Sequence, residues 1–194
     1  MADGIAKAQP DITKFTVHES TPYGMIFGPD GAIWFASEGY NFIGRMTTSG
    51  DVTRYPLPNP VSSPYDITVG PDGALWFTEI SGNRIGRITT SGEITEYNIP
   101  TAESIPYGIV TGPDGALWFT EALGNKIGRI TTSGVITEYP LPTPDAYPFL
   151  LVVGPDNALW FTNSFGDSIG RITTSGAITE YTSAEDYPLG ITVG

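Results

Sequence analysis

Side chains that could bind a ligand or a metal recur along this chain at one fixed spacing. Tyr23, Tyr65 and Tyr107 lie 42 residues apart, and Glu79 and Glu121 repeat with the same interval. A tyrosine ring presents a flat apolar face with a polar tip to a bound molecule. Carboxylates that converge from different parts of a fold could hold a hard cation such as Mg²⁺ or Ca²⁺ through oxygen ligands. The tyrosines are therefore candidates for ligand binding and the glutamates for metal binding.

The same positions also have a structural interpretation. Tyrosines can plug a channel, and glutamates can end strands in solvent. Other copies of the repeat carry different residues: Phe149 and Leu189 fill the tyrosine slot, and Ser37 and Asn163 fill the glutamate slot. Spacing alone leaves both interpretations open.

Few other residues suggest a catalytic or binding role. His18 is the single histidine, in the loop after the first predicted strand, and a lone loop histidine is weak evidence for acid–base catalysis. Arginine recurs in every copy, at Arg45, Arg87, Arg129 and Arg171, so we interpret it as a brace for the repeat. The sequence has no cysteine, Gly-rich phosphate loop or Gly-x-Ser-x-Gly motif, and no catalytic residue is assigned.

The elements that would position these residues repeat with the same period. Residues 112–121, Gly-Pro-Asp-Gly-Ala-Leu-Trp-Phe-Thr-Glu, have near-copies that begin at Gly28, Gly70 and Gly154. Pro-Asp-Gly predicts a tight turn, and the apolar run after it predicts a strand. In the fourth copy Asn157 replaces the turn glycine, and asparagine tolerates the left-handed region best among other residues.

Each period reads as four short strands, which in the third copy cover 109–111, 116–121, 127–132 and 135–139. Four antiparallel strands in about 40 residues are typical of a β-propeller blade. The second strand is apolar on both sides, which indicates that blades pack on both faces. With alternating strand directions, the tyrosine and glutamate slots share one end of the blades, where the loops differ most between copies.

The two ends of the chain contain additional pieces. Residues 11–17 resemble a fourth strand ahead of the first blade, and 189–193 resemble a first strand after the last. We expect a 1–10 tail and a single all-β propeller domain over 11–194, with repeats starting near 22, 64, 106 and 148. The prediction is four complete blades plus two single strands, a truncated or open ring with an incomplete blade at 188–194.

The composition of the chain limits the classes of partner that the protein could bind. The net charge of −12 argues against nucleic acid and anionic membranes, which need a basic face. No stretch of the 194 residues has the length and apolarity of a signal peptide or a membrane span. Together with the lack of cysteine, this predicts a cytoplasmic location.

Three repeated strings resemble the virginiamycin B lyase family: Gly-Pro-Asp-Gly-Ala-Leu-Trp-Phe-Thr-Glu, Asn-Lys-Ile-Gly-Arg-Ile-Thr-Thr-Ser-Gly and Ile-Thr-Glu-Tyr-Pro-Leu-Pro-Thr-Pro. The likeness runs from about Ile12 to Gly194, and the combination is specific. The resemblance implies the β-propeller fold of that family, whose members have seven blades. It also implies Mg²⁺-dependent elimination that opens streptogramin B antibiotics, cyclic depsipeptides, at the ester bond.

By this resemblance Tyr23 matches a tyrosine of the family's site, and Glu79 matches a glutamate that helps to hold Mg²⁺. The family's catalytic histidine would fill the tyrosine slot of the last blade, and no histidine fills that slot here. The resemblance therefore implies a lyase-like propeller with half a site and a cyclic peptide as ligand. The alternative is a non-catalytic repeat scaffold that binds a ligand or partner, or forms homo-oligomers through open blade faces.

Overall fold

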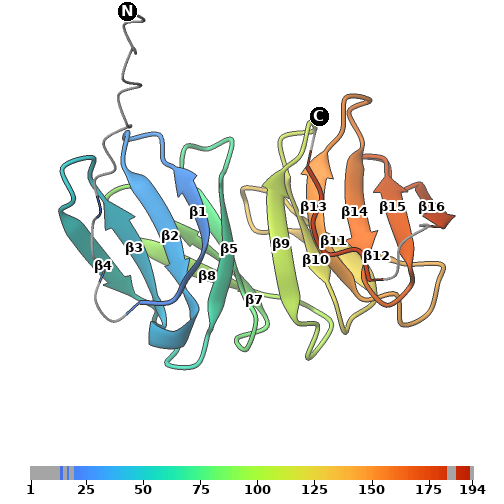
Figure 1. Ribbon diagram of the computed structural model, residues 1–194, viewed down its shortest axis with the longest axis horizontal. Coiled ribbons are helices and arrows are strands. Elements are labelled where there is room, and N and C mark those ends of the chain that lie inside the picture. Colours follow the sequence, from blue (N-terminus) through green and yellow to red (C-terminus); the bar gives the residue numbers. More distant parts are fainter. Residues whose placement is uncertain (1–13, 15–16, 18–19, 183–186, 193–194) are drawn as a thin grey trace, which may run out of the picture.

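The computed structural model describes residues 14, 17, 20–182 and 187–192. These residues form sixteen strands in four antiparallel sheets, and each sheet takes its four strands in chain order (Figure 1). One 3₁₀ turn, η1 (Glu38–Tyr40), is the only helical element among them. In this part of the chain no helix is long and apolar enough to cross a bilayer. The expected β-propeller blades are confirmed.

The strands keep the same lengths from blade to blade. They are β1 (Pro22–Phe27), β2 (Ile33–Ser37), β3 (Phe42–Met46) and β4 (Val52–Pro56) in blade 1; β5 (Pro64–Val69), β6 (Leu75–Glu79), β7 (Arg84–Ile88) and β8 (Ile94–Asn98) in blade 2; β9 (Pro106–Thr111), β10 (Leu117–Glu121), β11 (Lys126–Ile130) and β12 (Ile136–Pro140) in blade 3; β13 (Pro148–Val153), β14 (Leu159–Asn163), β15 (Ser168–Ile172) and β16 (Ile178–Thr182) in blade 4.

The cores lie between the blades. Trp34 of blade 1 packs into one cluster with Leu75 and Phe77 of blade 2, and the next two interfaces repeat this arrangement. Trp118 of blade 3, for example, is fully buried against Phe161 of blade 4. Each second strand therefore buries both of its sides, which explains why its sequence does not alternate between apolar and polar residues.

The Pro-Asp-Gly turn is tied to its blade by a repeated brace. In blade 3 the Trp118 indole donates to Asp114 at 3.0 Å, and the Arg129 Nε–H donates to the other oxygen at 2.7 Å. The Arg129 guanidinium also lies 5.9 Å from the tryptophan ring centroid. The same ion pair occurs in all four blades, so the structural interpretation of the four arginines holds.

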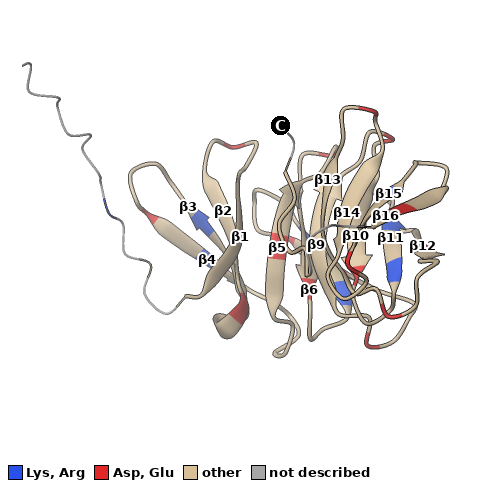
Figure 2. Ribbon diagram, turned by 45° about the vertical axis from the view of Figure 1, so that its right-hand side comes forward, with Lys and Arg blue, Asp and Glu red and all other residues tan. Residues whose placement is uncertain are grey.

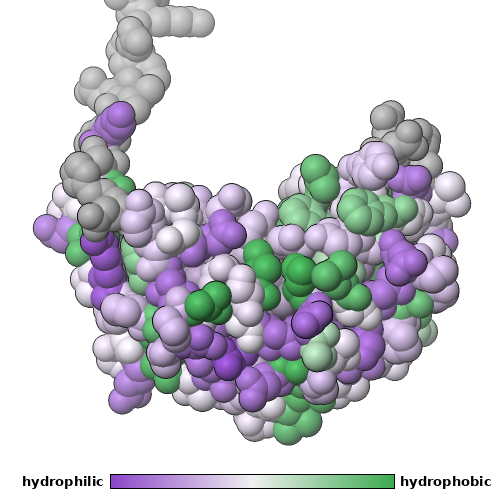
Figure 3. Space-filling view, turned by 90° about the horizontal axis from the view of Figure 1, so that it is seen from below, coloured by the Kyte–Doolittle hydropathy of each residue, from purple (hydrophilic) through white to green (hydrophobic). Residues whose placement is uncertain are grey.

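The four blades stand side by side around an axis, with the first strand of each blade innermost. The inner strands β1, β5, β9 and β13 follow one another in contact. The molecule is a crescent whose hollow lies on the side of these strands (Figures 1 and 3). The apolar blade interfaces thus bring the starts of four distant strands together.

One end of the blades carries both the turns between second and third strands and the connections between blades. Hydrogen bonds join the two sets: the Ile80, Ala122 and Ser164 amides donate to the carbonyls of Ser63, Ile105 and Tyr147 at 3.0–3.1 Å. We call this end the loop face, made of residues 38–41, 80–83, 122–125 and 164–167 with 57–63, 99–105 and 141–147.

The two predicted single strands have different outcomes. Residues 11–17 lie mostly outside the described residues. Residues 189–192 are not a strand, contrary to the prediction, because no described strand pairs with them. The Thr162 hydroxyl still contacts the Leu189 carbonyl at 3.5 Å, as the Thr120 hydroxyl contacts the Phe149 carbonyl at 2.8 Å. The segment therefore follows the path of an inner strand but lacks the backbone hydrogen bonds that would pair it with a neighbouring strand.

Candidate functional site

A β-bulge at the start of each inner strand places two consecutive residues opposite one residue of the second strand. In blade 2, Pro64 pairs with Glu79 and Ile67 pairs with Phe77, so Tyr65 and Asp66 share one position opposite Thr78. The Asp66 amide donates to the Thr78 hydroxyl at 3.1 Å, and that hydroxyl donates to the Tyr107 carbonyl at 2.8 Å. Bulges redirect side chains in this way next to binding sites.

The residues directly before β5, β9 and β13, and Tyr187 before Pro188, adopt an unfavourable backbone conformation. Ser63, Ile105, Tyr147 and Tyr187 all have φ between 52° and 56°, although each precedes a proline and one of them is β-branched. Such strain persists where the surroundings fix it. The amides of the neighbouring turns do so for the first three by binding their carbonyls.

The bulges bring the three predicted tyrosines into one cluster with Phe149. The ring centroids of Tyr23 and Tyr65 lie 4.7 Å apart and are stacked, and those of Tyr65 and Tyr107 lie 5.1 Å apart, edge to face. Phe149 completes the set at 4.8 Å from Tyr107. This axial aromatic cluster opens at its first-blade end, because Tyr23 is 53% exposed.

A second group of rings continues the cluster across the loop face. The Tyr107 and Tyr147 hydroxyls lie 3.3 Å apart, Tyr147 stacks on Phe165 at 4.5 Å, and Tyr187 lies 6.1 Å from Phe165. We call Tyr147, Phe165 and Tyr187 the loop-face aromatic row; Phe165 and Tyr187 are more than 60% exposed. Figure 3 shows apolar residues gathered on this end of the molecule.

Sequence reasoning missed the loop-face aromatic row. Tyr147 and Phe165 stand in the connections and turns that differ between copies, and that divergence was the available signal. A pocket of ≈ 90 Å³ is lined by Leu123, Asp145, Tyr147 and Phe165, among others. Burial and the Tyr147 hydroxyl raise the pKa of Tyr107, and burial raises that of Tyr65. At neutral pH both phenols are therefore protonated and can donate hydrogen bonds.

Asp66 is a second candidate site residue that the spacing did not indicate. Its two oxygens accept the amides of Ile67 and Ile109, each at 2.9 Å, so it links inner strands of blades 2 and 3. Burial raises its pKa to about 6. It lines a pocket of ≈ 200 Å³ together with Tyr23, Gly24, Tyr65 and Leu150.

Glu79 points into blade 2 and is fully buried. Burial raises its pKa to about 7, and the neighbouring Glu96 carboxyl on β8 adds to the rise. The Ser62 hydroxyl lies beside it but already donates to the Asn59 carbonyl at 3.2 Å. Neither Glu79 oxygen accepts a hydrogen bond from a described donor with good geometry. These surroundings favour the neutral acid, which can donate.

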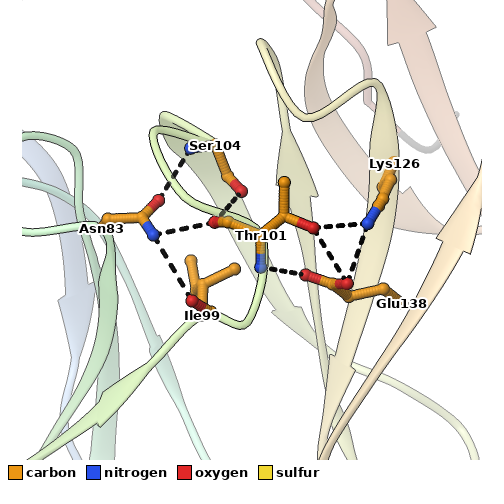
Figure 4. A network of polar contacts seen from close by, with 6 residues as sticks. All are labelled: Asn83, Ile99, Thr101, Ser104, Lys126 and Glu138. Atoms are coloured by element: carbon orange, nitrogen blue, oxygen red, sulfur yellow. Dashed lines mark hydrogen bonds and ion pairs between the residues drawn. The ribbon is translucent and has the colours of Figure 1, made fainter.

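Glu121 has the same surroundings in blade 3. Burial first, and then the Glu138 carboxyl, raise its pKa to about 7, and its oxygens also lack a described donor. Glu138 itself accepts the Thr101 amide at 2.9 Å and the Lys126 ammonium at 2.8 Å (Figure 4). Because Thr101 belongs to the connection from blade 2, this network ties two blades together.

Blade 4 shows what the glutamate slot does. Asn163 stands there, and its amide donates to Glu180 at 3.0 Å and to the Ser168 hydroxyl at 2.9 Å. Glu180 in turn accepts the Thr143 hydroxyl from the preceding connection at 2.7 Å. In blade 4 the slot therefore supplies a donor to the glutamate of the fourth strand, and a protonated Glu79 or Glu121 is chemically able to do the same.

The described residues do not fit a Mg²⁺ site at these glutamates. Mg²⁺ prefers an octahedral set of oxygens, several of them water. Glu79 and Glu121 are buried in separate blades, and no three acidic, histidine or cysteine side chains gather anywhere in the described ranges. The assignment of both to a metal stays a prediction, and His18 lies outside the described residues.

Comparison of the chain with known proteins supports both the repeat and the β-propeller fold. The virginiamycin B lyase family model matches residues 10–194. A catalytically inactive virginiamycin B lyase from Staphylococcus aureus, solved with quinupristin, is 51% identical with a TM-score of 0.88; the match covers 91% of this chain and 61% of that one. A streptogramin B lyase structure is 40% identical with a TM-score of 0.87, covering 93% and 61%.

Shorter matches occur among curated proteins. The virginiamycin B lyase of Bordetella pertussis is 43% identical over 53 residues, which are 26% of this chain and 18% of that protein. The chain thus spans 61% of the length of the solved relatives. Since the family model covers the whole described fold, the chain belongs to the virginiamycin B lyase family.

Proposed function

We propose that the loop face of this chain binds a streptogramin B-type cyclic depsipeptide and forms part of the binding surface of a virginiamycin B lyase. The observation that carries the proposal is the continuous path of rings from Tyr23 through Tyr107 to Tyr147 and Phe165. A relative at 51% identity was solved with quinupristin, which supports this class of ligand.

The chemistry of the surface suits a cyclic peptide with an ester. Stacked and edge-on rings give apolar contact at little cost in side-chain entropy. The raised pKa values of Tyr65 and Tyr107 keep their hydroxyls protonated, so they can donate to ester or amide carbonyls and orient the ring. Ser63 and Ile105, two residues before these tyrosines, both adopt the left-handed conformation, so the two inner strands begin in the same way.

The elimination step itself needs a base within hydrogen-bond reach of the substrate proton. The two tyrosines hold their protons too firmly, and Glu79 and Glu121 face the blade interior. By family resemblance the reaction is a Mg²⁺-dependent opening of the ester bond, and the ion would stabilise the negative charge that develops. No step of this reaction is assigned to the residues described here.

A second function, ligand binding without catalysis, is favoured by one specific observation. Glu79 and Glu121 are fully buried beneath the loop-face turns, so they present no exposed carboxylate to a ligand on that face. A propeller of this kind would hold the peptide without opening it.

The experiment measures binding and turnover together. Quinupristin is titrated into the chain by calorimetry, and ring opening is followed by mass spectrometry with Mg²⁺ present. We expect binding that weakens at least about tenfold in Tyr107→Leu and Phe165→Ala, as is usual for aromatic anchors. Val135→Ala, at an exposed turn at the other end of the blade, is the matched control.

The proposal of peptide binding is contradicted if these aromatic variants bind as well as the original chain. Turnover separates the two functions: binding with no ring opening supports the scaffold, or a lyase that needs residues beyond those described. Ring opening that survives in the presence of a chelator would contradict the Mg²⁺-dependent mechanism.

A further inference from the structure

The strongest unexplained feature of the axis is an ionised carboxylate without an ion pair. Asp66 has a pKa of about 6, so at neutral pH it is mostly charged. Both of its oxygens accept backbone amides, and no described Lys or Arg forms an ion pair with it. The four inner strands contain no basic residue at all (Figure 2). A charge held in this way calls for a cation.

The pocket beside Asp66 is lined by two tyrosine rings together with Gly24 and Leu150. The stacked rings of Tyr23 and Tyr65 form one wall, Leu150 forms another, and the absent side chain of Gly24 leaves room. A Cβ atom on Gly24 would lie 2.8 Å from the Asp66 Oδ1 atom, so this carboxylate oxygen faces β1 directly. Glu38 adds a negative charge close enough to raise the pKa of both Tyr65 and Tyr107.

We propose that this pocket binds the ammonium group of an organic ligand, with the tyrosine faces against the cation and Asp66 as its counter-ion. Aromatic faces attract substituted ammonium groups through cation–π contacts. A hard metal ion is disfavoured, because it needs several oxygen ligands and the pocket supplies one carboxylate. At ≈ 200 Å³ the pocket accepts a head group and excludes a whole cyclic peptide.

This inference deepens the proposed function and rests on it for the identity of the ligand. The pocket opens beside the axial aromatic cluster, so a peptide bound on the loop face could place an amino group there. The ligand class is therefore a depsipeptide that carries a basic amine. The ammonium site can be tested without any antibiotic.

The probe is choline, and its neutral isostere 3,3-dimethylbutan-1-ol is the matched control ligand. Both are titrated into the chain at constant ionic strength and followed by saturation-transfer NMR. We expect choline to bind with a Kd on the order of 1 mM, as a few cation–π and ionic contacts provide. The neutral isostere should bind at least about tenfold more weakly.

Three variants decide where binding occurs. Asp66→Asn and Tyr23→Leu should each weaken choline binding about tenfold; Tyr23 is 53% exposed, so its replacement spares the fold even if Asp66→Asn does not. Glu93→Gln removes the same charge from an exposed turn and should change nothing. Equal binding of the isostere, or an equal loss in Glu93→Gln, would overturn the proposal, since attraction to the −12 charge would then explain the binding.

Competition by quinupristin separates this inference from the proposed function. Choline binding that depends on Asp66 but is not displaced by quinupristin would support the ammonium site and contradict the proposed ligand. Quinupristin binding without any choline binding would keep the proposed function and overturn the ammonium site.

Discussion

At the scale of single residues, the environment decides what a side chain does more than its type. Glu79, Glu121 and Asn163 occupy equivalent positions, and the asparagine reveals the shared role because it can only donate through its nitrogen. The Ser62 and Ser104 hydroxyls already donate to backbone carbonyls, so facing the glutamates they can only accept. In blades 2 and 3, burial and the neighbouring carboxyl group of the fourth strand raise the pKa of Glu79 and Glu121, which favours one shared proton for each pair.

The first prediction concerns the pH dependence of stability. The pKa of Glu79 and Glu121 rises from 4.5 to about 7 on folding, so the folded state binds more protons. Their stabilisation is complete below pH 4.5 and is lost as the pH rises through 7, by up to about 1.4 kcal/mol per pH unit for each group. Glu79→Gln and Glu121→Gln cannot ionise and should be more stable than the original chain above pH 7.

Urea unfolding at pH 5 and pH 8 checks this result. The unfolding free energy of the Gln variants should match that of the original chain at pH 5 and exceed it at pH 8. Glu93→Gln at an exposed turn should leave the change in unfolding free energy between the two pH values as it is in the original chain. A Gln variant that loses the same stability at pH 5 and at pH 8 would contradict the hypothesis that the paired carboxyl groups share a proton. Loss of Mg²⁺-dependent stabilisation in the same variants would instead support the metal assignment.

At the scale of elements, the repeat made most of the blade predictable. The Pro-Asp-Gly turns, the two-sided second strand and the bracing arginines follow from residues that recur in every copy. The bulges, the left-handed residues before the prolines and the contacts of Asp66 did not follow, because they depend on how neighbouring inner strands approach one another. Tyr147 and Phe165 likewise belong to loops without a repeated pattern.

The second prediction tests the packing of the third strand. A Cβ atom at Gly128 would lie 2.1 Å from the fully buried Phe119 ring, so Gly128→Ala forces that ring to move. Overpacking of this kind costs about 1–3 kcal/mol of unfolding free energy. Gly190→Ala, where no atom lies within 4 Å, is the matched control and should be near neutral. Thermal unfolding of the two variants measures the difference; equal melting temperatures would contradict this packing of Phe119 against Gly128.

At the scale of the whole molecule, the faces of the outermost blades differ from the three buried interfaces. Met25 and Phe27 of blade 1 are more than 60% exposed, and Tyr181 of blade 4 is 47% exposed. Trp160 is only partly buried, whereas Trp34, Trp76 and Trp118 are fully buried. The described residues thus leave two apolar faces uncovered.

The third prediction is that the 194-residue chain associates in solution, since exposed apolar patches of this kind drive association. Light scattering at micromolar concentration should give a mass above the 20.7 kDa of one chain. Met25→Lys together with Phe27→Lys should shift the mass toward the monomer. A monomer mass for the original chain would show that these faces do not self-associate.

We propose that the loop face of this lyase-family propeller binds the ligand. The most direct test is to map chemical-shift changes in the chain as quinupristin is added. We expect the largest changes at Tyr65, Tyr107, Tyr147 and Phe165, and none at the Pro-Asp-Gly turns at the opposite end. Changes confined to those turns or to the exposed blade faces, or none at saturating quinupristin, would contradict the claim.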